Sequence, residues 1–112
     1  MSRREARAWL RTNPSPAALA FNTLRTPARM RRFVERVYRA GAERVEVDTK
    51  DMGVDFEPHR GRRTVSTDAL YVTLPAGAAM ARVDAALDRG APQEKRCRTT
   101  LMGRRVCRLW WD

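Results

Sequence analysis

The feature that most restricts the fold of this chain is a helical segment with one apolar stripe, between Thr26 and Gly41. Thr26-Pro27 is a typical helix start, because a side-chain cap precedes a proline at the first helical position. Apolar residues then recur at spacings of three and four: Met30, Phe33, Val34, Val37 and Ala40. Gly41 suits a left-handed C-terminal cap. A helix with one stripe needs a second layer to bury it.

Three further segments predict a sheet and a second helix. Residues 44–48 and 69–74 alternate apolar and polar side chains, which is typical of half-buried strands. Residues 77–89 predict a helix that ends at Gly90 and whose stripe consists of Met80, Val83 and Leu87. Two helices with one stripe each cover one face of a sheet, which leaves the other face for water or a partner.

The remaining segments set the predicted topology. Residues 17–25 predict a first strand, and residues 49–67 a long, mobile loop with one irregular extended piece near Val54 and Phe56. The order matches a ferredoxin-like βαββαβ two-layer sandwich of α+β class with an extra C-terminal hairpin strand. Residues 1–16 predict an N-terminal helical appendage, with Ala6, Trp9 and Leu10 on one side, and a Pro-rich linker. Residues 17–112 then form a single α+β domain.

The end of the chain predicts a hairpin around Gly103 in one of two registers. A three-residue loop, 101–103, sets Thr100 opposite Arg104 and Cys97 opposite Cys107. A two-residue turn instead sets Cys97 opposite Arg108, and only the first register allows a cross-strand disulfide. The chain has no apolar leader and no stretch that spans a bilayer, so we expect a cytoplasmic protein with free thiols.

Catalytic and metal-binding patterns are missing from the sequence. His59 is the only histidine, and the two cysteines ten residues apart match no zinc pattern. The acids around residues 48–57 lack the spacing of a calcium-binding EF-hand loop, and the glycines form no phosphate-binding loop. We expect a non-enzymatic protein with no catalytic residue, no metal and no cofactor.

The charge pattern points instead to a polyanion. The formal net charge is +10, from 23 basic and 13 acidic residues, and nearly all the basic residues are arginine. On the first helix, arginines spaced by three, four and three line one flank: Arg29, Arg32, Arg36 and Arg39. The three-residue register puts a second set on the open sheet face: Arg96, Arg98, Arg104 and Arg108 with Trp110, joined by Tyr71, while Cys97, Leu101, Cys107, Leu109 and Trp111 face the helices. Guanidinium groups bind phosphates and exposed rings stack on bases, so this pattern predicts nucleic-acid binding, single strands in particular.

Other interpretations of the same residues remain open. A charge run at helical spacing is usually a solvated face, and Tyr71 and Trp110 equally suit a homodimer through the open sheet face. The strand 68–74 lacks the signature of an RNA-recognition motif. The alternative function is a protein-interaction module, immunity- or antitoxin-like or an accessory subunit, that binds an acidic protein partner.

Three stretches resemble a group of small uncharacterised bacterial proteins of the planctomycete type. They are residues 33–47, the strand from Asp68 to Pro75, and the terminal Leu109-Trp110-Trp111-Asp112. This group often has Gly-Gln ahead of the final strand, where this chain has Gly103-Arg104. No activity is associated with the group, so the resemblance implies an α+β fold and adds no function.

Overall fold

Five strands form the main sheet, in the order β1-β2-β5-β7-β6, and each pair of neighbours is antiparallel. The computed structural model describes residues 3–13, 15–48, 52–57 and 62–112, and of these it describes 52–57 and 62–65 through their backbone only. The bounds of the strands are Arg3–Glu5 for β1, Arg44–Asp48 for β2, Ala69–Leu74 for β5, Arg105–Trp110 for β7 and Glu94–Thr99 for β6.

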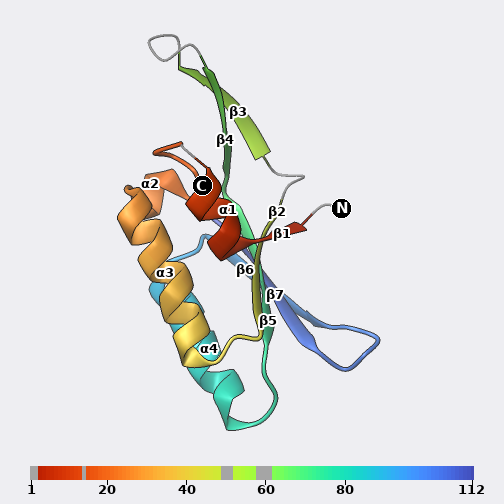
Figure 1. The fold of residues 1–112 in the computed structure, drawn as a ribbon. Helices are drawn as coiled ribbons and strands as arrows, with labels where there is room; N and C mark the ends of the chain where they lie inside the picture. The colour runs from red at the N-terminus through yellow and green to blue at the C-terminus, as the bar shows by residue number, and fades with distance from the viewer. Residues whose placement is uncertain (1–2, 14, 49–51, 58–61) are drawn as a thin grey trace.

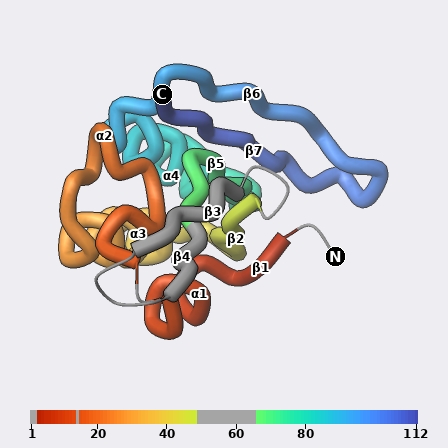
Figure 2. Tube along the Cα trace, turned by 90° about the horizontal axis from the view of Figure 1, so that it is seen from above, coloured from red at the N-terminus to blue at the C-terminus, as the bar shows by residue number. Residues whose placement is uncertain are grey.

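Helices cover one face of this sheet, so the fold is a two-layer α+β sandwich (Figures 1 and 2). The two long helices are α3, Pro27–Ala40, and α4, Ala78–Arg89. They run antiparallel, because Gly41 at the end of α3 lies beside Ala79 near the start of α4, and Gly90 lies beside Phe33. The core between the layers consists of fully buried side chains from both: Met30, Val34, Val37, Val45, Val47, Leu70, Val72, Leu74, Leu87, Leu109 and Trp111.

The predicted helices and strands with strong local signals are confirmed. Thr26 caps α3 by accepting a hydrogen bond from the Arg29 amide, and Gly41 ends it with φ +123°. The predicted strands at 44–48 and 69–74 are β2 and β5, and the predicted helix at 77–89 is α4.

The predicted first strand at residues 17–25 is wrong. The segment contains α2, Phe21–Leu24, a four-residue helix flanked by Ala20 and Arg25, both with positive φ. Leu19 makes a single parallel bridge to Thr67, and it is fully buried between two buried alanines. The apolar side chains therefore fill the core from an irregular segment. The ferredoxin-like order depended on this strand and is not confirmed.

The predicted loop at residues 49–67 is also wrong over most of its length. β3, Met52–Glu57, and β4, Arg62–Thr67, form a separate two-stranded antiparallel sheet in which Val54 pairs with Val65. Figure 1 shows this ribbon extending beyond the main sheet. The side chains near Val54 and Phe56 lie outside the described residues, as do those of the acids at 51, 55 and 57.

The C-terminal hairpin adopts the three-residue register. The Thr100 amide donates to the Arg104 carbonyl over 2.7 Å, and Gly103 has φ +80°. Cys97 lies directly opposite Cys107 and the two form a disulfide, so the expectation of free thiols is wrong. Leu101 was predicted to face the helices, but it is fully exposed at the hairpin tip because the strands end before it.

The N-terminal segment is part of the domain. β1 pairs with β2, and α1, Ala6–Thr12, buries Ala6, Trp9 and Leu10 in the common core. The helix therefore has the apolar side that the sequence predicts. The predicted boundary after residue 16 does not separate two structural units. Within the described residues, no helix combines the length and apolar character needed to cross a bilayer.

Candidate functional site

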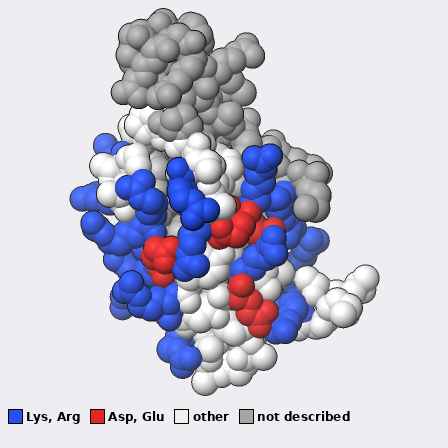
Figure 3. Space-filling model, viewed as in Figure 1, with Lys and Arg blue, Asp and Glu red and all other residues white. Residues whose placement is uncertain are grey.

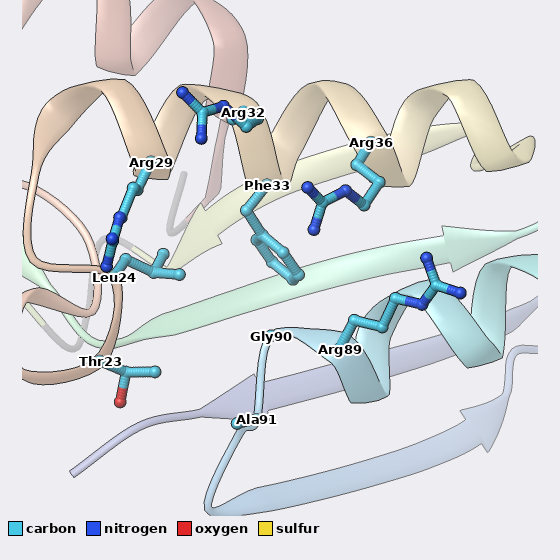
Figure 4. Close-up of a pocket in the computed structure, with 9 residues that line it drawn as sticks. All are labelled: Thr23, Leu24, Arg29, Arg32, Phe33, Arg36, Arg89, Gly90 and Ala91. Atoms are coloured by element: carbon cyan, nitrogen blue, oxygen red, sulfur yellow. The ribbon is translucent and has the colours of Figure 1, made fainter.

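The four predicted arginines of α3 line a groove between α3 and α4. Arg29, Arg32 and Arg36 border a hollow of about 260 Å³. Arg36 and Arg39 border a second hollow, of about 390 Å³. Arg36 and Arg89 belong to both hollows, so the two adjoin along the line between the helices, and together they are called the interhelical groove. Figure 4 shows the residues of the first hollow.

Sequence reasoning missed the two arginines that α4 contributes to this groove, Arg82 and Arg89. They lie two helical turns apart and so share one face of α4. Asp84 and Asp88 between them gave the helix a mixed charge pattern. In the structure these two carboxylates point to the other flank, where Lys95 Nζ donates to both, over 3.0 and 2.7 Å. The spacing of seven between the two arginines was the signal that would have revealed them.

The floor of the interhelical groove is apolar and tightly packed. Phe33, only 3% exposed, lies between the helices, and the ring of Trp111 meets it edge-on with centroids 5.8 Å apart. Trp111 is fixed in turn, because its Nε1 donates to the Gly90 carbonyl over 2.8 Å. Figure 4 shows Arg36 and Arg89 reaching toward one another above this floor. The groove therefore combines a fixed apolar base with guanidinium rims.

Charge in the interhelical groove is not neutralised by the described part of the chain. No described carboxylate lines the groove, and none of its six arginines forms an ion pair with a described acid. Glu35 lies on the α1 side of α3, where Arg7 binds it over 2.8 Å. The hydrogen bonds from Arg7, with a smaller effect of the Arg39 charge, lower the pKa of Glu35. Figure 3 shows the resulting dense cluster of basic side chains over the α3 side of the molecule.

The second predicted set lies on the opposite, open face of the sheet. Tyr71, Arg108 and Arg96 are neighbours across β5, β7 and β6, and with Arg98 they border a hollow of about 250 Å³. Trp110 is on the same face, half-buried at the end of β7. The sheet itself separates these residues from the interhelical groove.

Acidic partners accompany most arginines of the open sheet face. Arg108 Nη2 lies 3.3 Å from Asp48 Oδ2, and Arg104 Nη1 lies 2.6 Å from Glu43 Oε1. Arg96 is 3.7 Å from the carboxylate of Glu94. These pairs reduce the positive potential of this face relative to the groove.

Guanidinium groups already contact the ring of Tyr71 on the open sheet face. The Arg3 guanidinium lies 3.6 Å from its centroid, and Arg108 lies 5.9 Å away. A base cannot stack on the side of the ring that Arg3 covers. The predicted binding residues thus form two surfaces, and among the described side chains the groove gathers its arginines without acids.

One group of possible metal ligands occurs among the described side chains. Atoms of Asp84, Cys97 and Cys107 lie within 4.8 Å of one another. Metals bind the thiolate form of cysteine, and here the two sulfurs are bonded to each other. This arrangement is a cross-link between β6 and β7 beneath α4.

Fold and site together define a two-layer α+β domain with a cationic groove between its two long helices. No model of a known protein family, no curated protein and no solved structure matches the chain. The planctomycete-type resemblance therefore stays a prediction from the sequence.

Proposed function

We propose that this domain binds nucleic acid through its phosphate backbone, and that the interhelical groove is the contact surface. One observation carries the proposal: six arginines from two helices line one groove, and no described carboxylate lies among them. A guanidinium group offers a planar fork of donors that matches phosphate oxygens, so each rim position is suited to one phosphate contact.

The dimensions of the α3 row support this assignment. Arg29 and Arg39 are ten residues apart, which corresponds to about 15 Å along a helix. Phosphates on one strand of a duplex advance by about 3.4 Å along its axis while the strand also winds around it, so a straight row faces roughly two or three of them. Arg82 and Arg89 would contact the same backbone from the other rim. Apart from its arginines, the groove has Thr23 as its one polar lining side chain among the described residues, which favours binding without sequence recognition.

A pair of charge-matched variants tests the proposal. Arg36→Gln/Arg89→Gln removes two charges from the groove, and Arg96→Gln/Arg98→Gln removes two from the open sheet face. Each lost charged hydrogen bond costs about 1 kcal/mol or more, so we expect the groove variant to bind roughly 30-fold more weakly. The sheet-face variant should stay within about threefold of the wild type, because it changes only the long-range potential.

The measurement is fluorescence anisotropy of a labelled 16-mer oligonucleotide at about 50 mM salt, where phosphate contacts are strong. Circular dichroism of each variant checks that it is folded. An equal loss of affinity in both variants would show that net charge, not the groove, attracts the oligonucleotide. Absence of binding by the wild type at this salt concentration, both to the 16-mer single strand and to its duplex, would exclude the proposed function.

A further inference from the structure

We infer that the ligand of the interhelical groove is double-stranded nucleic acid, held by the backbone of one strand. This inference rests on the proposed function and goes beyond it, because it selects between duplex and single strand. The sequence pattern alone favoured single strands, through stacking on Tyr71 and Trp110.

The groove offers no described aromatic ring on which a base can stack. Phe33 and Trp111 form and support its floor, but they are 3% and 1% exposed. Phe21 on α2 is 44% exposed, yet it is not among the residues that line the groove. Tyr71 and Trp110 lie beyond the sheet. Proteins that bind single strands depend on such rings for much of their affinity, so a single strand would gain little here.

The electrostatics of the groove favour a duplex as well. A duplex carries about one charge per 1.7 Å of its axis, and each neutralised phosphate releases about 0.9 counterions, against about 0.7 for a single strand. If each of the six arginines neutralised one phosphate, the slope of log K against log salt would reach its limit, about −5.4 for a duplex and about −4.2 for a single strand. Where contacts are purely ionic, the ligand with the larger counterion release binds more tightly at low salt.

The shape of the rim agrees with one strand of a duplex. The row from Arg29 to Arg39 covers about 15 Å, which is less than half of the roughly 34 Å turn of a duplex. A duplex strand winds through almost half a turn over an axial rise of this length, so the straight row follows one strand over about two or three phosphates before the strand curves away. The floor beneath is fixed by Phe33 against Gly90 and Trp111, so a backbone would be held by the guanidinium groups at the rims.

The experiment compares three labelled ligands with the wild-type protein: a mixed-sequence 16-nucleotide single strand, its 16-base-pair duplex, and a second duplex of different sequence. Anisotropy titrations are recorded at several salt concentrations between about 50 and 200 mM. We expect the duplexes to bind at least tenfold more tightly than the single strand and within threefold of each other. We expect the duplex slope to be steeper than the single-strand slope and no steeper than about −5.4.

Two ring variants keep the inference open to refutation. Phe21→Ser and Trp110→Ala should leave duplex affinity within twofold, with Phe21→Ser the safer variant because its side chain is exposed. The inference would be overturned if the single strand bound more tightly than the duplexes, or if either folded variant lost binding of the single strand. Both results would leave the proposed function standing. Failure of all three oligonucleotides to bind would instead overturn the proposed function itself.

Discussion

Replacing Gly90 with alanine tests the packing of the groove floor. Gly90 has φ −76° and ψ −3°, which alanine adopts without strain, and loss of a glycine alone stabilises a fold by about 0.4–1 kcal/mol. The added Cβ, however, would lie 2.5 Å from Cε1 and 2.7 Å from Cζ of Phe33. These distances are about 1 Å shorter than an optimal carbon–carbon contact.

The Phe33 ring cannot move aside freely, because the ring of Trp111 packs against it edge-on. Overpacking of this kind costs about 1–3 kcal/mol, so we expect Gly90→Ala to lower the free energy of unfolding by about 1–2 kcal/mol. Urea unfolding followed by tryptophan fluorescence gives this value by linear extrapolation. In the Phe33→Leu background the same change should cost at least 1 kcal/mol less, since the shorter side chain leaves room. An unchanged or raised stability, or an equal cost in both backgrounds, would refute the reasoning.

Three further predictions concern the body of the domain. Glu5 accepts hydrogen bonds from two amides of α1 and from Tyr38 Oη; burial alone would raise its pKa, but these bonds lower it below 4.5. The ionised form of Glu5 therefore stabilises the fold. We expect Glu5→Gln to lower the free energy of unfolding by about 1 kcal/mol at neutral pH, and this difference should vanish as pH falls through the lowered pKa of Glu5. A difference in thermal melts that does not depend on pH would contradict this. The cysteines of the Cys97–Cys107 disulfide are ten residues apart, so its reduction should lower the free energy of unfolding by about 2.7 kcal/mol. Urea titrations with and without a dithiol measure this difference. An unchanged unfolding midpoint would argue against the cross-link. Trp9→Ala should cost about 3–5 kcal/mol in the same assay, whereas a cost below about 1 kcal/mol would mean that the N-terminal segment is not part of the core.

The parts of the fold that the sequence predicts are those with signals close together along the chain. For α3 the cap at Thr26, the apolar stripe and Gly41 all occur within sixteen positions and agree with one another. For the hairpin, Gly103 marked the turn but left two registers open, and the structure has the one that pairs Cys97 with Cys107. The disulfide was missed because it was argued from an expected compartment and not from this geometry.

The parts that the sequence did not predict depend on contacts between distant segments. Leu19 belongs to an alternating pattern that is typical of a strand. In the structure it is buried against Met30 of α3 and the chain near Thr67, so its burial does not require a strand within the main sheet. β3 and β4 stabilise one another through a backbone ladder that begins at Met52 and Thr67, and neither segment has a strong signal alone.

The candidate site was half predictable for the same reason. Helical spacing placed the arginines of α3 on one flank, but only the packing of α4 against α3 adds Arg82 and Arg89 to it. Two of the three acids that pair with the sheet-face arginines come from far along the chain: Asp48 is 60 positions from Arg108, and Glu43 is 61 from Arg104. Local spacing does not reveal pairs between such distant residues. The sequence therefore predicted a more positive open sheet face than the structure has.

The most direct test of the interhelical groove as the binding surface is an NMR titration of ¹⁵N-labelled protein with a 16-base-pair duplex. Backbone amide signals and arginine Nε–Hε signals are followed together with the indole signal of Trp110. The account predicts that the largest shifts cluster on α3 and α4, at Arg36 and Arg89 above all, while Arg96, Arg98 and Trp110 change little. Shifts concentrated on β6, β7 and the Trp110 indole would contradict it and place the nucleic acid on the open sheet face.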